Sequence, residues 1–384
     1  FQTDSLHDRS SFGLRALPVD PLPFEQGEAY SVTFSPNFLT ADLSTTRPFE
    51  IAIGNGLTRT VTLQETAQYR LGQERWLLSP PDDEFWGPLE SAEGRRVRLT
   101  YPQRDEAVAL RLVEDLDRKV DELCATLDDI SCAPDLSLDI ALSSDPATLV
   151  DAKRPHPAVK SEQGLRITLP APTLIGIPQD EEAYQALYRG YAAQMATATI
   201  AQQVGYECCE QLPFFQALID NQLSELALKS WPVIADDYES ILVEQVRVKD
   251  FSPLWRSDDP QDLYGPDGWR VYALVDYLLD VVPDSSQIVL QRELVRRGGF
   301  LCWLNGLLAS ESEHSNSALL SMLTRGFWLR GYEQVLNSGE DSRPVMPAQD
   351  LLLTCVINNP VSEDDQEATI YRFALGDGDW IPGN

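Results

Sequence analysis

Residues 188–206, YRGYAAQMATATIAQQVGY, predict a buried helix around which the rest of the chain can be arranged. The segment is rich in small and apolar side chains, and it holds no histidine, cysteine or acidic residue. Asp180, Glu181 and Glu182 precede it and supply an N-cap and first-turn charges that complement the helix dipole. We therefore expect a long helix that begins near Asp180 and ends near residue 205.

The segments before this helix change from a strand pattern to a helix pattern. Residues 1–25 contain three prolines and predict an extended lead-in, and short alternating runs over residues 28–100 predict an antiparallel β domain. Apolar residues then recur at helical spacing in 103–127. Two strand-like segments follow at 136–142 and 164–170, so the expected order is strand, helix, strand, strand, helix.

The segments after residue 205 predict a mostly helical region and a final return to strands. Prolines fall between apolar periodic segments from 211 to 337, and the last residues read as a β hairpin. The predicted fold class is α+β in three parts. These are an N-terminal antiparallel β module with its lead-in (1–96), an α+β domain with a mostly helical C-terminal half (97–340), and a short C-terminal β element (341–384).

The charge balance excludes several classes of partner. The 384 residues contain 30 Lys and Arg against 60 Asp and Glu, a formal net charge of −30, which repels nucleic acids and anionic lipids. The apolar run at 271–282 is too short to cross a bilayer and contains two Asp. Because the chain starts at Phe1 rather than Met, we expect a missing upstream portion. Membrane contact is expected only through an anchor there.

The six cysteines favour an oxidising compartment outside the cytoplasm. Cys124 and Cys132 enclose a short polar loop that a disulfide could close. The pairing of the other four, Cys208, Cys209, Cys302 and Cys355, stays open, as does the alternative that all six are buried thiols.

The residues that usually carry catalysis are scarce. His7, His156 and His314 are the only histidines, and none has a second histidine at metal-ligand spacing. Nucleophile-elbow, P-loop and dinucleotide-binding motifs are absent, and the acidic turns at 262–268 and 375–380 lack a full calcium-ligand set. We expect no catalytic residue, no metal and no cofactor, although a pair of catalytic carboxylates has no reliable pattern and stays possible.

The order of elements in 97–337 resembles the gluzincin-type (peptidase MA-like) zinc metallopeptidases, whose active helix carries H-E-x-x-H. Aligned with that motif, the helix has Tyr191, Ala192 and Met195 at catalytic positions. The resemblance therefore implies a degenerate, non-catalytic metallopeptidase scaffold. The chain is also similar to uncharacterised Chloroflexi-type bacterial ectodomains through RWLLSPPDDEFWG (75–87), YPQRDE (101–106) and GYAAQ (190–194), which implies an exported, membrane-anchored origin.

Aromatic residues in acidic, proline-rich loops allow two interpretations. They are caps on the core or anchors of an interface. The residues concerned are Phe85, Trp86, Trp255, Tyr264 and Trp269.

These observations predict a non-catalytic extracytoplasmic domain of a membrane-anchored bacterial protein that binds a protein or small-molecule ligand, or senses a signal. Two alternatives stay open. The first is a metal-independent hydrolase that uses acidic residues, and the second is a cytosolic regulator such as a protease substrate or an anti-sigma-like partner protein.

Overall fold

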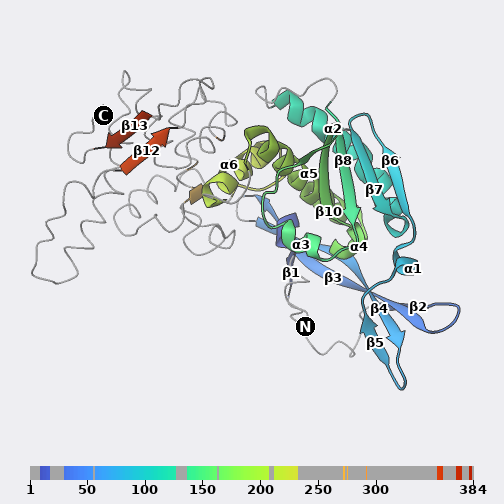
Figure 1. The fold of residues 1–384 in the computed structure, drawn as a ribbon. Coiled ribbons are helices and arrows are strands. Elements are labelled where there is room, and N and C mark those ends of the chain that lie inside the picture. The colour runs from blue at the N-terminus through green and yellow to red at the C-terminus, as the bar shows by residue number, and fades with distance from the viewer. Residues whose placement is uncertain are drawn as a thin grey trace, which may run out of the picture. The chain divides into compact units, whose positions relative to one another are not determined.

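The computed structural model describes residues 9–17, 30–54, 57–126, 136–161, 164–206 and 212–231, four helical positions between 271 and 291, and three strands between 353 and 382. The fold is α+β, as predicted. Figure 1 shows the helices and strands of these described residues. The chain divides into two compact units. Unit 1 comprises Phe1–Gln203 with Asp220–Pro232, and unit 2 comprises Val204–Ile219 with Val233–Asn384.

A long antiparallel hairpin forms the centre of the first sheet in unit 1. Strands β3 (Thr40–Gly54) and β4 (Leu57–Leu71) pair along their whole length. At one end they are flanked by β1 (Arg15–Ala16) and β11 (Ile177–Pro178), and at the other end by β2 (Tyr30–Phe34) and β5 (Trp76–Ser79). The predicted N-terminal antiparallel β module is confirmed.

The second sheet of unit 1 is mixed, and its strand order is β6-β7-β8-β10-β9. Its three central strands are parallel and its two edges are antiparallel. The strands are β6 (Leu89–Glu93), β7 (Val97–Pro102), β8 (Leu138–Ser143), β9 (Val159–Ser161) and β10 (Gly164–Pro170). The domain boundary expected at residues 96 and 97 falls in the β6–β7 hairpin, and both sides of it belong to unit 1.

Helices join and cover these strands in the order that the sequence predicts. Helix α2 (Glu106–Thr126) connects β7 to the parallel strand β8, and α5 (Glu181–Val204) follows β10. The structure adds the short helices α1 (Asp83–Trp86), α3 (Ala147–Asp151) and α4 (Pro172–Ile175) and two 3-10 turns, η2 (Ser10–Phe12) and η3 (Gln103–Asp105). Alternate residues of β7 and β8 are buried, which is typical of a sheet with one face covered by helices.

The N-terminal segment packs directly on α5 because a glycine allows a close approach. A Cβ atom at Gly190 would lie 2.7 Å from Cδ1 and 3.0 Å from Cα of Phe12. Beside it, Gln194 Nε2 donates to the carbonyl oxygen of Ser11 at 2.8 Å. The lead-in is therefore attached to the buried helix within residues 9–17.

The described parts of unit 2 include a small C-terminal sheet. Strands β12 (Leu353–Ile357), β13 (Thr369–Phe373) and β14 (Trp380–Pro382) form an antiparallel sheet in chain order, so the predicted hairpin is present with a third strand. Helix α6 (Leu212–Glu225) falls within the helix expected at 211–229 and spans the division between the units. The helices predicted from 235 to 337 lie almost entirely outside the described residues. Within the described part of the chain, no helix combines the length and apolar character needed to cross a bilayer.

Substituting Gly190→Ala tests the close packing of the N-terminal segment on α5. Helix propensity alone would make alanine more stable by about 1 kcal/mol. Because the new methyl group would overlap Phe12, we expect a net loss of about 1–3 kcal/mol in the free energy of unfolding, measured by urea denaturation. In a Phe12→Ala background the same substitution should cost clearly less, and an equal cost in both backgrounds would contradict the proposed contact.

Candidate functional site

The helix positions that would be catalytic in a metallopeptidase lie in the core of unit 1. Tyr191, Ala192 and Met195 each have 0% of their surface exposed. The Tyr191 hydroxyl donates a 2.6 Å hydrogen bond to the carbonyl oxygen of Pro170, and its ring meets Phe12 edge to face at 5.2 Å. Burial raises the pKa of Tyr191 well above its usual value. These three side chains pack the helix and have no access to a substrate.

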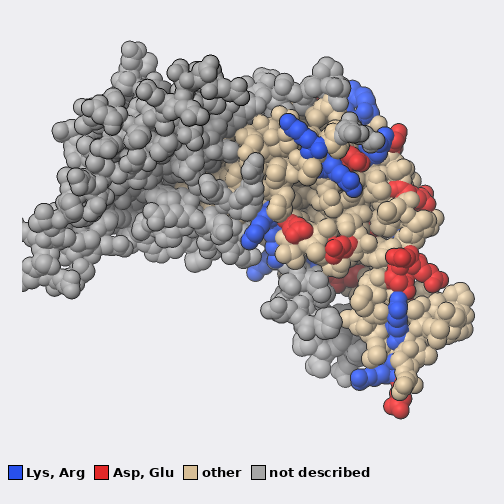
Figure 2. All heavy atoms as spheres, viewed as in Figure 1, with Lys and Arg blue, Asp and Glu red and all other residues tan. Residues whose placement is uncertain are grey.

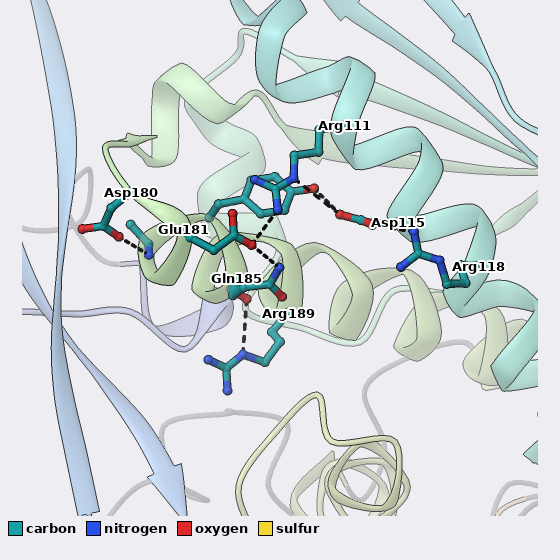
Figure 3. A network of polar contacts seen from close by, with 9 residues as sticks. Arg111, Asp115, Arg118, Asp180, Glu181, Gln185 and Arg189 are labelled. Atoms are coloured by element: carbon teal, nitrogen blue, oxygen red, sulfur yellow. Dashed lines mark hydrogen bonds and ion pairs between the residues drawn. The ribbon is translucent and has the colours of Figure 1, made fainter.

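The first turns of α5 are joined to α2 by charged and aromatic side chains (Figure 3). Arg111 Nη2 donates to Glu181 at 2.6 Å, and its guanidinium lies 3.5 Å from the centre of the Tyr184 ring. The Tyr184 hydroxyl donates to Asp115 at 2.6 Å, and Asp115 also pairs with Arg118 at 3.0 Å. The hydrogen bond from Arg111 is the main reason that the pKa of Glu181 falls to about 2. This network holds α2 and α5 together, and each charged side chain in it is paired with another group of the network.

The start of α5 is capped as the sequence predicts. Asp180 Oδ1 accepts a hydrogen bond from the Ala183 amide at 2.8 Å, and Glu181 and Glu182 occupy the first turn.

Asp105 is a buried carboxyl group that no sequence motif indicates. It is 1% exposed, and its Oδ1 atom accepts hydrogen bonds from the Thr173 amide at 2.9 Å and the Thr173 hydroxyl at 2.7 Å. Its Oδ2 atom is buried without a hydrogen-bond partner among the described residues. Burial raises the pKa of Asp105 to about 6, although the hydrogen bonds from Thr173 oppose the shift. Asp105 joins η3 to α4 and does not reach solvent.

Polar contacts attach the end of the long hairpin to α1 and η3. We call them the polar latch, and they consist of Arg70 with Asp82 at 2.7 Å and Arg104 with Asp42 at 3.1 Å. Asp82 also caps α1 by accepting from the Phe85 amide at 2.9 Å, which is the main cause of its lowered pKa. Arg104 lies over the Phe85 ring at 3.7 Å.

The strand register places these latch residues on one side of the hairpin end. Asp42 and Arg70 occupy even-numbered positions of β3 and β4, and the neighbouring odd-numbered residues face the other side. We call the hairpin end the arm; it consists of β2, residues 40–45 of β3, residues 65–71 of β4, and β5.

The side of the arm opposite the latch carries a row of apolar residues that the register brings together. Tyr30, Val32 and Phe34 of β2 lie opposite Thr45, Leu43 and Ala41, and Tyr69 and Leu71 of β4 lie opposite Leu78 and Trp76 of β5. We call this surface the distal face. It consists of Tyr30, Val32, Phe34, Ala41, Leu43, Ala67, Tyr69, Leu71, Trp76 and Leu78.

The outer strands of the distal face are exposed to solvent. Tyr30 is 63% exposed, Phe34 49% and Leu78 68%. The Phe34 ring lies 5.7 Å from that of Trp76, so the face contains an aromatic cluster. Strand β2 is labelled in Figure 1, and Figure 2 shows the same view with charged residues coloured. The surface around β2 shows no Lys, Arg, Asp or Glu in this view. Contiguous exposed apolar patches often serve as interaction sites, so this face is a candidate binding surface.

Next to the distal face, the turn between β2 and β3 holds a strained aromatic residue. Phe38 has a positive φ of 57° and is 65% exposed. Left-handed backbone is unfavourable for a bulky side chain, and burial does not compensate for the strain here. Because strained residues cluster at functional sites, Phe38 is a candidate contact residue.

The residues singled out from the sequence lie in different places. Phe85 and Trp86 are 6% and 7% exposed and contact each other edge to face at 5.0 Å, which corresponds to the core-cap interpretation. His156 is exposed, as expected, and within the described chain no three His, Cys, Asp or Glu side chains group together as a metal site would require.

The remaining sequence candidates are only partly described. Cys124 is disulfide-bonded. Its proposed partner Cys132 lies outside the described residues, as do Trp255, Tyr264, Trp269, His7 and His314. The sequence did contain a signal for the distal face, namely the alternation in YSVTF at 30–34, but alternation alone does not show whether the apolar side is covered.

Comparison of the chain with protein-family models, curated proteins and solved structures finds no match. The functional argument therefore depends on the geometry described above.

Replacing Asp105 with Asn tests the buried carboxyl group. The pKa of Asp105 is about 6 in the folded protein and near 3.8 in the unfolded chain. Between these two pH values the carboxyl group is therefore protonated in the folded state and ionised in the unfolded state. The contribution of Asp105 to stability is therefore greatest below about pH 4 and is lost as the pH rises through about 6. Asp105→Asn imitates the protonated form, so its stability relative to the wild type should rise by roughly 2 kcal/mol between about pH 4.5 and about pH 7.5.

Urea denaturation of both proteins at the two pH values measures this change. The other carboxyl groups are the same in both proteins, so their effect cancels in the difference between the two free energies of unfolding. A difference that stays constant with pH would contradict the assignment.

Proposed function

We propose that this chain is a non-catalytic binding domain whose ligand-binding surface is the distal face of the arm. The observation that carries the proposal is the exposure of Tyr30, Phe34 and Leu78 on a largely apolar face. The charged residue on this side of the arm is Glu65 at its inner end, which is 21% exposed and pairs with Arg9 and Arg47. Burying such a face gains about 25 cal/mol for each Å² of apolar surface removed from water. The exposed, strained Phe38 beside this face supports the same proposal.

The burial of the central residues of α5 supports the proposal that this helix has a structural role and no catalytic one. Tyr191, Ala192 and Met195 fill the core, and Tyr191 is held by Pro170. If the chain shares the metallopeptidase ancestry that its element order suggests, the site was replaced by packing residues while the helix was retained.

The disulfide at Cys124 supports an extracytoplasmic location. Disulfides persist in oxidising compartments and are rare in the cytosol. This favours an exported domain of a membrane-anchored bacterial protein over a cytosolic regulator. A binding or signal-sensing domain of that kind would present the arm to a partner outside the cell membrane.

The hydrolase alternative receives less support. It needs a carboxyl group with a raised pKa that a substrate can reach. Asp105 has the raised pKa, but it is 1% exposed and its Oδ1 atom is occupied by Thr173.

Site-specific photocrosslinking in the cells that produce the protein tests the binding surface. A benzophenone amino acid replaces either Phe34, on the distal face, or Thr33, its exposed neighbour on the opposite face. We expect a crosslinked protein adduct from position 34 and little or none from position 33, because only the distal face is apolar. Adducts of equal yield from both positions, or from neither, would contradict the proposal.

A further inference from the structure

We infer that Asp105 is a pH-sensitive joint within unit 1: when its buried carboxyl group ionises, the short helix α4 is released locally from η3. The inference concerns regulation of the fold and does not depend on which molecule binds the distal face. It begins from the contact between Asp105 and Thr173, which lie 68 residues apart in the chain.

Asp105 serves as the N-cap side chain that α4 lacks. The N-cap residue of α4, Ala171, supplies no side-chain hydrogen bond. Asp105 takes this role from η3, since its Oδ1 atom accepts from the amide and the hydroxyl of Thr173 at 2.9 and 2.7 Å. A protonated carboxyl group keeps both bonds when the proton is on Oδ2, because Oδ1 still accepts. The neutral form of Asp105 therefore holds α4 in place.

The ionised form of Asp105 has no ion pair to compensate its burial. Asp105 is 1% exposed, and its Oδ2 atom has no hydrogen-bond partner among the described residues. The cation that acts on it is the adjacent Arg104. The guanidinium of Arg104 is engaged elsewhere, because its Nη1 atom donates to Asp42 at 3.1 Å and to the Phe85 carbonyl oxygen at 3.3 Å. A buried carboxylate of this kind is costly unless it can reach water.

The other elements around Asp105 supply no second counter-charge. Helix α4 contains no ionisable side chain, and Glu106 at the start of α2 is exposed. Tyr191 of α5 interacts electrostatically with Asp105, but its hydroxyl donates to Pro170. Burial accordingly raises the pKa of Asp105 to about 6.

The position of α4 makes its release local and gives it a consequence. Helix α4 follows β10 of the second sheet and leads into β11, which pairs with Leu63 and Gln64 of β4 in the first sheet. At its other end, the Leu174 and Ile175 carbonyl oxygens accept from Arg9 at 2.9 and 3.0 Å. Ionisation of Asp105 therefore loosens one end of the segment that connects the two sheets, while Arg9 still holds the other end.

The direction of the pH effect follows from the two states of Asp105. Local opening exposes the carboxyl group to water, where its pKa is near 3.8, whereas the closed form has a pKa of about 6. The open form ionises first as the pH rises, so opening becomes more favourable from about pH 4 and levels off above about pH 6. Between about pH 4 and about pH 7 the opening constant should rise by up to roughly fiftyfold.

Hydrogen exchange of the purified full chain, followed by mass spectrometry over this pH range, tests the inference. Exchange rates are divided by the intrinsic rate at each pH. We expect protection of residues 172–176 to fall by up to roughly fiftyfold as the pH rises, while protection of β8 stays nearly constant as an internal reference. Protection of 172–176 that does not change with pH, or an equal change in β8, would overturn the inference.

Two substitutions assign the effect to this carboxyl group. Asp105→Asn keeps an acceptor for Thr173 and cannot ionise, so the pH dependence at 172–176 should disappear. Thr173→Val removes the hydroxyl donor that lowers the pKa of Asp105, so the fall in protection should continue to a higher pH than in the wild type. This second variant decides the question if Asp105→Asn does not fold. A pH dependence that either variant leaves unchanged would overturn the inference.

Discussion

The hydrogen-bonded ladder between β3 and β4 is the constraint on which this arrangement depends. Side chains alternate between the two sides of a strand. The pairing register that starts at Gly54 and Leu57 therefore fixes which side of the sheet each side chain of β3 and β4 occupies. A slip of one residue would replace Phe49 and Leu63 in the core by polar neighbours such as Glu50 and Thr62. The same register that builds the core of unit 1 therefore also gathers the apolar residues of the distal face.

Polar contacts orient the parts that this ladder joins. The latch pairs Arg70 with Asp82 and Arg104 with Asp42, so the arm is held by its polar side. Asp105 connects η3 to α4 through Thr173, and Arg111 connects α2 to α5 through Glu181. Three of these contacts join segments more than 60 residues apart. None of them covers the apolar side of the arm.

The sequence predicts the elements of unit 1 better than it predicts the site. Hydrophobic periodicity and capping identified the amphipathic helix α2, the segments that form β8 and β10, and the start of α5 at Asp180, because each depends on local pattern. The 15-residue strands β3 and β4 appeared as several shorter runs, since polar residues such as Thr46 and Arg47 interrupt the apolar pattern. The exposure of Tyr30 and Leu78 and the burial of Asp105 depend on which distant segment packs nearby, and periodicity contains no such information.

The central claim is that function resides in the apolar side of the arm and not in helix α5. Hydroxyl-radical footprinting of side chains, in the producing cells and in dilute purified protein, tests this claim most directly. The account predicts that Tyr30, Phe34 and Trp76 react readily in dilute solution and are protected in cells, while Tyr191 is unreactive in both. Unchanged reactivity of the three arm residues, with protection appearing elsewhere on the described surface, would contradict it.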